Sequence, residues 1–218
     1  MHFEIECAGE NILLLSDRAL YWPKKKTLLI ADVHLGKAEY FRKNGIPVPV
    51  GTTKLILFRL DKLISQYPTE NIYFIGDLFH NPDFLSNELL SCFIEWRKRT
   101  VSVNCFLVTG NHDKVIDNNV ITNNLHILSP SHHLSPFDLT HNFEENSSMF
   151  QITGHVHPIY RLKKGSIEKI KFPCFVVRPK VLILPAFGEF VGGYKVSPQI
   201  NQSIYLCCDQ DIIGININ

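Results

Sequence analysis

The stretch Leu28-Leu29-Ile30-Ala31-Asp32-Val33-His34 decides the fold class of this chain. Its first four residues form an apolar run typical of a buried β-strand, and polar residues follow directly. Three further runs end in the same way: 72–75 before Gly76-Asp77, 105–108 before Gly110-Asn111-His112-Asp113, and 149–152 before Gly154-His155-Val156-His157. Because open α/β sheets bind ligands at the carboxyl ends of their strands, these polar segments are predicted to meet and form a two-metal site.

Strand and helix patterns alternate around that stretch in the first half of the chain. Strands are expected over 3–15 and 19–22, with polar turns at 9–11 and 16–18. Apolar residues recur at helical spacing over 52–66, where Thr52 or Thr53 can cap the start, and again from about 83 to 99. The second half is poorer in helix, and its strand candidates are 137–139, 149–152, 175–177, 181–184 and 204–207. This order predicts an α/β fold in which two mixed β-sheets pack as a sandwich flanked by helices.

Length and composition are those of an ordinary soluble domain. The chain has 218 residues, 45% of them hydrophobic, and no low-complexity stretch marks a linker. We therefore expect a single domain over 1–218. The amino terminus lacks a basic start and a long apolar core, and no run is long enough to span a bilayer. These features favour a cytoplasmic location without membrane association, and they leave the oligomeric state open.

Charge and cysteine content narrow the function classes further. The formal net charge of +1 argues against a surface coated in positive charge, so any nucleic-acid contact has to rest on local patches. The candidates are 24–26, 97–99 and Lys163-Lys164, each of which can equally be a solvated turn or a helix end. The six scattered cysteines lack zinc-ribbon spacing and are interpreted as reduced core thiols, with metal ligation as the alternative.

The residue types of the four polar segments are those of metal ligands. Asp32 and His34 are two apart in an extended segment, so both side chains can point to the same metal. The Asp77 carboxylate offers one oxygen to each of two ions, and Asn111 offers a neutral carbonyl oxygen. His155 and His157 repeat the same-side spacing, and could reach one ion each.

The ordered set D-x-H, G-D, G-N-H-D and G-H-x-H resembles the signature of the calcineurin-like metallophosphoesterase superfamily, which also contains a further isolated histidine. A single buried aspartate or histidine more often serves a turn or a core hydrogen bond, but the full set after successive strands indicates the superfamily. Within it, Leu29–Lys37, Phe41–Pro49 and Leu184–Tyr194 are similar to the ligase-associated DNA-damage-response endonucleases of the PdeM type. The resemblance extends from about Leu14 to Tyr205.

This resemblance implies two divalent metal ions, with manganese as the first choice and iron, zinc or cobalt as alternatives. One ion would be held by Asp32, His34, Asp77 and His157, and the other by Asp77, Asn111, His141 and His155. His141 follows a short apolar strand, and His126, His132 and His133 compete for its role. Many superfamily members have His-Gly-His where this chain has His141-Asn142-Phe143.

The implied chemistry is hydrolysis of a phosphate ester. Two ions about 3.5 to 4 Å apart would lower the pKa of the water between them, and the resulting hydroxide would attack phosphorus. His112 would act as general acid or charge stabiliser at the leaving oxygen. Asp113 would either hold the His112 imidazole or cap the following turn, and His80 would either contact substrate phosphate or pack as a loop histidine. The Phe187–Phe190 segment is a candidate border of the site that could stack a nucleobase.

The predicted function is therefore a metal-dependent phosphoesterase that hydrolyses phosphodiester bonds. The resemblance implies DNA as substrate, a link to DNA repair, and repair ligase or helicase partners. Alternatives are a phosphomonoesterase or a nucleotide or pyrophosphate hydrolase of the same fold, and a non-catalytic metal-binding scaffold.

Overall fold

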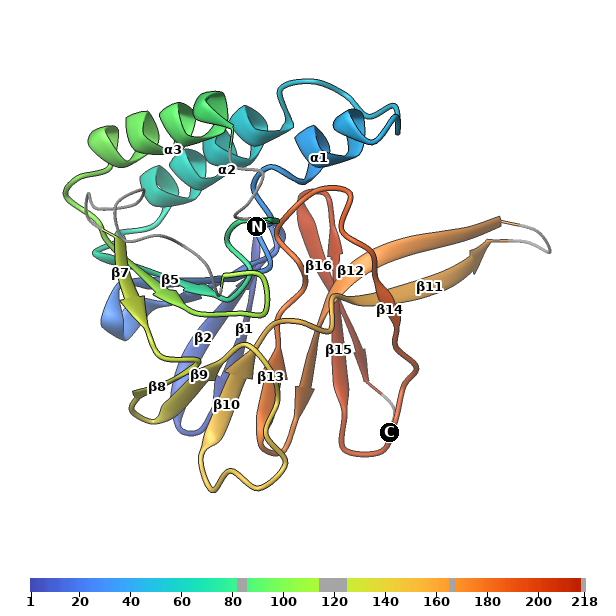
Figure 1. Cartoon of the computed structure of the whole chain (residues 1–218). Coiled ribbons are helices and arrows are strands. Elements are labelled where there is room, and N and C mark those ends of the chain that lie inside the picture. The colour runs from blue at the N-terminus through green and yellow to red at the C-terminus, as the bar shows by residue number, and fades with distance from the viewer. Residues whose placement is uncertain (82–85, 114–124, 165–167, 217–218) are drawn as a thin grey trace.

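A computed structural model describes residues 1–81, 86–113, 125–164 and 168–216 (Figure 1). The described strands form two mixed sheets, which confirms the predicted architecture. The first sheet has the order β1-β2-β3-β4-β5-β6-β7, antiparallel from β1 to β4 and parallel from β4 to β7. Its strands are β1 (His2–Cys7), β2 (Glu10–Leu15), β3 (Ala19–Trp22), β4 (Thr27–Ala31), β5 (Asn71–Ile75), β6 (Asn104–Val108) and β7 (Leu125–Leu128).

The second sheet has the order β14-β11-β12-β13-β10-β9-β8, and β15 pairs with β12 and β16 beside this path. In it, β9, β10 and β13 are parallel neighbours, as are β11 and β14, and the other pairs are antiparallel. The strands are β8 (Ser131–Leu134), β9 (Phe137–Thr140), β10 (Phe150–Thr153), β11 (Pro158–Lys164), β12 (Glu168–Arg178), β13 (Val181–Ile183), β14 (Tyr194–Lys195), β15 (Ser203–Cys208) and β16 (Asp211–Asn216).

The described helices lie over the outer face of the first sheet (Figure 1). They are α1 (Lys37–Lys43), α2 (Thr52–Gln66) and α3 (Asn87–Arg99), with a short 3-10 turn at Pro23–Lys25. None of them is long and apolar enough to cross a membrane. The helix expected over 52–66 is α2, and α3 begins after Ser86, whose side chain accepts a hydrogen bond from the Leu89 amide. Residues 82–85, where that second helix was expected to begin, lie outside the described residues.

The expected threonine cap of α2 is wrong. Gly51 occupies the N-cap position in a left-handed conformation, and no side chain caps the helix. Thr53 instead donates to the Glu39 carboxylate (3.1 Å), and Thr52 donates to the Pro49 carbonyl (3.2 Å). Both threonine hydroxyls are used to fix the segment between α1 and α2, because the tight turn at Gly51 places them inside the helix rather than before it.

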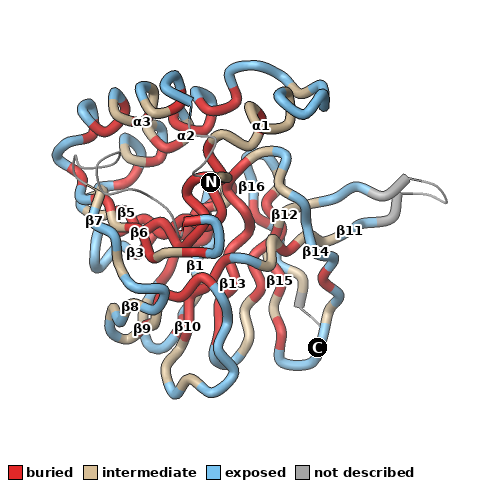
Figure 2. Tube along the Cα trace, viewed as in Figure 1, coloured by how far each residue is buried: buried red, intermediate tan, exposed pale blue. Residues whose placement is uncertain are grey.

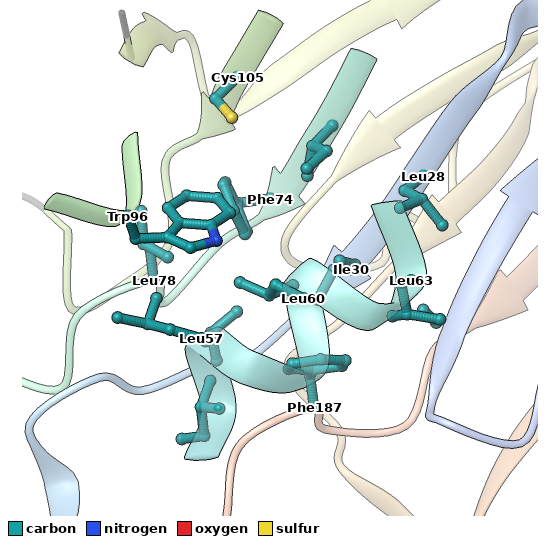
Figure 3. Close-up of a cluster of buried hydrophobic side chains, with 14 of the residues drawn as sticks. Leu28, Ile30, Leu57, Leu60, Leu63, Phe74, Leu78, Trp96, Cys105 and Phe187 are labelled. Atoms are coloured by element: carbon teal, nitrogen blue, oxygen red, sulfur yellow. The ribbon is translucent and has the colours of Figure 1, made fainter. Parts of the chain in front are cut away.

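Strand β4 separates two layers of buried side chains. Leu28 and Ile30 pack against α2 and α3, in the cluster that includes Leu60, Phe74 and Trp96 (Figure 3). Leu29 and Ala31 point to the opposite face and pack in the layer between the two sheets. A strand buried on both faces needs an unbroken apolar run, which explains the sequence pattern there. Figure 2 shows the same distribution, with buried residues concentrated in the strands and alternating with exposed ones along the helices.

The six cysteines are free, and four of them are buried, as expected for core thiols. Burial raises the pKa of Cys105 and of Cys174 to about 12. No cysteine takes part in a potential metal-binding group among the described residues.

Candidate metal centre

The predicted ligands lie where strands of the two sheets end. Asp32 and His34 follow β4, Asp77 follows β5, and Asn111 follows β6, while the second sheet supplies three histidines after β9 and β10. These three are His141, His155 and His157. Parallel pairing of β4 with β5 and of β9 with β10 aligns the strand ends, so the loops converge across the gap between the sheets.

The backbone at the candidate ligands is unusual. Eleven described non-glycine residues have positive φ, and five of them are Asp32, His34, Asp77, His155 and His157. A left-handed conformation costs an L residue roughly 1 to 3 kcal/mol and persists only where the surrounding structure enforces it. This concentration of left-handed residues after the strands makes the edge the candidate functional site.

Asp32, His34 and His157 form the first potential metal-binding group, with ligand atoms all within 4.8 Å of one another. His157 Nε2 lies 3.2 Å from Asp32 Oδ1. Asp32 Oδ1, both ring nitrogens of His34 and His157 Nε2 are buried without a hydrogen-bond partner. Native proteins rarely leave such atoms unsatisfied, and a set of carboxylate oxygen and imidazole nitrogen is the donor set of divalent cations. The residues therefore fit a metal ion.

The second group contains Asp32, Asp77 and His141. Asp77 Oδ2 lies 3.4 Å from His141 Nε2 and 3.7 Å from His34 Nε2, so this carboxylate stands between a histidine of each sheet. His155 extends the group, because its Nδ1 is 3.2 Å from His141 Nε2 and 3.4 Å from the Asn111 amide nitrogen. The structure thus brings together the four side chains predicted for the second ion.

The three histidines that competed with His141 lie elsewhere. The rings of His126 and His132 stack on Phe106 and Tyr73, and His133 pairs with Asp138 at 2.8 Å. Asn142, where the sequence departs from His-Gly-His, donates to the Asn111 amide oxygen at 3.4 Å. That departure therefore places a second amide beside the predicted second site.

Charges within the centre influence one another strongly. Burial disfavours the charged forms of both Asp77 and His141, but their mutual contact lowers the pKa of Asp77 and raises that of His141. His34 differs, because burial dominates and lowers its pKa far below the ordinary value. A neutral His34 has one ring nitrogen with a free lone pair, as metal binding requires, while the other ring nitrogen carries a hydrogen.

His112 lies at the exposed rim of the centre. Its side chain is 44% exposed, and its Nε2 is 3.9 Å from Asp77 Oδ2. Its backbone amide donates to Asp77 Oδ1 at 2.9 Å, which ties the β6 loop to the β5 loop. The geometry leaves the imidazole free to face a molecule bound over the centre.

His80 packs against His112, and the centroids of their stacked rings are 5.4 Å apart. Together with His34 the two form a third potential metal-binding group. The Nδ1 atom of His80 is buried without a hydrogen-bond partner, and burial, with the nearby charge of Lys37, lowers the pKa of His80 to about 4. The packing of the His80 ring agrees with the predicted loop histidine, and its unpaired Nδ1 agrees with the predicted contact to substrate phosphate.

The Asp113 carboxylate accepts hydrogen bonds from three backbone amides rather than from the His112 imidazole. The donors are Asp77 (2.6 Å), Gly110 (2.9 Å) and Leu78 (3.1 Å). All three donors precede Asp113, so these contacts differ from both predicted roles, and the carboxylate joins two ligand-bearing loops. The turn after Asp113, which it was expected to cap, lies outside the described residues. Burial raises the pKa of Asp113 to about 6 although these amides favour its charged form.

Two glycines of the motifs are required by close approach. A Cβ on Gly76 would lie 2.0 Å from His141 Nδ1, and one on Gly110 would lie 2.4 Å from Asp77 Oδ1. Gly76 also has a φ of +72°. Any side chain at these positions would displace a candidate ligand.

Sequence reasoning missed Arg59, which anchors the segment that crosses behind Asp32. The Phe187 and Gly188 amides donate to the Ala31 and Asp32 carbonyls at 2.9 and 3.0 Å. Arg59 pairs with Glu189 at 2.8 Å, donates to the Phe187 carbonyl, and stacks its guanidinium 3.8 Å from the Phe187 ring centroid. Phe187 is fully buried, so its ring is not available to stack a nucleobase, whereas Phe190 in the same segment is exposed. No local pattern could reveal Arg59, because its partners are about 130 residues away.

Comparison with known proteins agrees with this geometry. Residues 25–189 match the family model of calcineurin-like phosphoesterases. A solved structure of the Pseudomonas putida nuclease MPE is 33% identical and has a TM-score of 0.84, covering 95% of this chain and 97% of that one.

Two more distant structures were also found, and both have TM-scores too low to carry an argument. The Escherichia coli phosphoesterase Yfce is 14% identical with a TM-score of 0.44, covering 88% of this chain and 99% of that one. An Aquifex aeolicus protein of unknown function is 22% identical with a TM-score of 0.40, covering 60% and 78%. No curated protein sequence matches the chain. From the family match and the extent of the likeness to the Pseudomonas nuclease, this chain is a metal-dependent phosphoester hydrolase that belongs to the calcineurin-like phosphoesterase family.

Proposed function

We propose that this protein hydrolyses phosphodiester bonds of nucleic acid. The observation that carries the proposal is the pair of adjacent potential metal-binding groups, which share Asp32 and contain buried atoms without partners. Two neighbouring cation sites suit an anionic ester that must be bound and attacked at once. Nucleic acid as substrate rests on the likeness to a nuclease over almost the whole chain.

Residues of both sheets would together hold two metal ions. Asp32, His34, Asp77 and His157 would hold one, and Asp77, Asn111, His141 and His155 the other. When bound, such ions neutralise phosphate charge and supply a water of lowered pKa. Manganese is the first candidate, and iron, zinc or cobalt suit the same mixture of nitrogen and oxygen donors.

The remaining polar residues have roles that follow from their positions. His112, at the exposed rim, would protonate or stabilise the leaving oxygen. Asp113 is a positioning residue, because its three backbone contacts hold the loops of Asp77 and His112. His80 would contact the substrate phosphate, directly or through its stack with His112.

A metal-supplemented substrate panel tests this function. Purified protein with manganese should hydrolyse a chromogenic phosphodiester and single- or double-stranded DNA, and a chelator should abolish the activity. Hydrolysis of a phosphomonoester, nucleotide or pyrophosphate without attack on any diester would replace the proposal by the alternative of the same fold. If the protein binds metal fully but hydrolyses none of these substrates, the result favours a non-catalytic scaffold. We expect catalysis instead, because the predicted ligand set is complete.

A place in DNA repair, ligase or helicase partners and a cytoplasmic location complete the proposal. They rest on the sequence resemblance. A deletion strain should be sensitive to DNA-damaging agents, and the wild-type chain, but not Asp77→Ala, should restore its resistance.

A further inference from the structure

A two-stranded arm formed by β11 and β12 extends from the sandwich beside the metal centre (Figure 1). Strand β11 begins at Pro158, directly after the candidate ligand His157. Strand β14 runs along its base, where the Tyr194 amide donates to the His157 carbonyl at 3.0 Å. The arm is therefore attached to a metal-ligand loop by both chain continuity and pairing.

Charge is concentrated on this arm. The segment 158–173 contains five lysines and arginines and one glutamate, a net charge of +4, although the whole chain carries only +1. The rest of the molecule is consequently acidic on balance. An arm of this sign is complementary to a polyanion and not to the rest of its own surface.

The strand register places like charges opposite one another. Arg161 pairs with Lys171, and Lys163 is opposite Lys169 in the same ladder. Parallel pairing of Ile159 with Lys195 adds a cation on the same face as Arg161, because paired residues and alternate residues share a side. Arg161, Lys171 and Lys195 are exposed and form no ion pair with any described residue. Like charges in opposite positions destabilise a sheet, so this pattern does not serve the stability of the arm.

We propose that this cationic face, defined by Arg161, Lys171 and Lys195, binds the phosphate backbone of a nucleic-acid strand and leads it to the metal centre. The inference rests on the proposed function for the identity of the polyanion. Exposed cations on a twisted β-ribbon follow a charged backbone without reading its bases, so binding should depend strongly on salt and weakly on sequence. The outer described residues of the arm, 161–162 and 170–171, are exposed and so accessible to such a strand (Figure 2).

The test uses the variant Arg161→Gln/Lys171→Gln and the charge-matched control Lys54→Gln/Lys180→Gln, whose exposed lysines lie in α2 and after β12. Binding of a fluorescein-labelled oligothymidine is measured by anisotropy, with chelator present so that no hydrolysis occurs. The arm variant should bind on the order of tenfold more weakly at low salt, and its salt slope should fall by about 1.4, as for two lost single-strand phosphate contacts. The control should retain wild-type binding.

Equal affinity and slope in the two variants would overturn the proposal. So would loss of binding to phosphatidylserine vesicles with unchanged oligothymidine binding, which would assign the arm to an anionic membrane. Hydrolysis of a small chromogenic phosphodiester, measured for both variants, tests the proposed function separately from the arm proposal. If the wild type hydrolyses no diester but the binding difference persists, the function fails and the arm proposal stands.

Discussion

The metal centre and the β11–β12 arm both contain polar groups that the fold leaves unpaired, but they differ in burial and in sign. At the centre, one carboxylate oxygen of Asp32 and several imidazole nitrogens are buried without hydrogen bonds. On the arm, cations face solvent and each other. Unpaired buried lone pairs require a small cation that can enter, whereas exposed like charges require a large anion that remains in water. One molecule that combines both is suited to hold a polyanion against metal ions.

Loss of Asp77, which belongs to both predicted ligand sets, should have the largest effect. Asp77→Ala removes the oxygen that lies between His34 and His141, so bound metal and diester hydrolysis should both be lost. Metal content by mass spectrometry and hydrolysis rates measure this, and Asp138→Ala, beside exposed His133, is the matched control. Wild-type turnover by Asp77→Ala would refute the two-metal mechanism.

Replacement of His112, at the rim of the centre, should change the rate of hydrolysis without changing metal binding. His112→Ala is expected to lower the hydrolysis rate about a hundredfold or more while metal content stays at the wild-type level. The reason is that this exposed imidazole faces the site without belonging to either predicted ligand set. If the variant loses both metals, His112 is a ligand and not a general acid.

The buried Asp113 carboxylate should contribute to the stability of the fold. Asp113→Ala leaves three buried backbone amides without an acceptor, which should lower the free energy of unfolding by about 3 kcal/mol or more. Urea denaturation of the metal-free protein measures this effect. A loss below that of Asp138→Ala would show that water replaces the carboxylate.

Acid should weaken the metal-free protein through His80. Its folded pKa is about 4 against an ordinary 6.5, chiefly because of burial, so between these values the unfolded chain takes up a proton that the folded chain does not. Stability should therefore decrease as pH falls from about 6.5 towards 4, and His80→Gln should flatten that decrease. Melting temperatures across this range test it, with His126→Gln on exposed β7 as control; an unchanged slope in His80→Gln contradicts the assignment.

The arm should give the smallest effect on stability. Arg161→Gln/Lys171→Gln removes a repulsive cross-strand pair, so the free energy of unfolding should stay constant or rise by a few tenths of a kcal/mol at low salt. A clear loss of stability in urea denaturation would show that these side chains serve the fold, and would remove the contrast with the centre.

Most of the candidate site was predictable because its residues follow strands that are marked in the sequence. The run 28–31 is apolar throughout because β4 is buried on both faces, and α2 has the expected period because it buries one face. The Gly51 turn displaced the expected threonine cap, because a cap depends on the backbone before the helix rather than on residue type alone. The long β11–β12 arm was also missed except at 175–177, although polar and apolar residues alternate with the period of a strand at 161–163 and 169–171.

By itself the sequence determined the buried strands that precede the motifs and the types of ligand, because a buried strand and a metal site each demand particular side chains at particular spacing. Only the tertiary structure decided which histidine faces Asp77, that Asp113 holds backbone amides, and that Arg59 anchors the segment behind Asp32. It also decided that the cations of the arm share a face. These contacts join residues far apart in the chain. They are determined by how the strands and the two sheets come together, rather than by any local pattern.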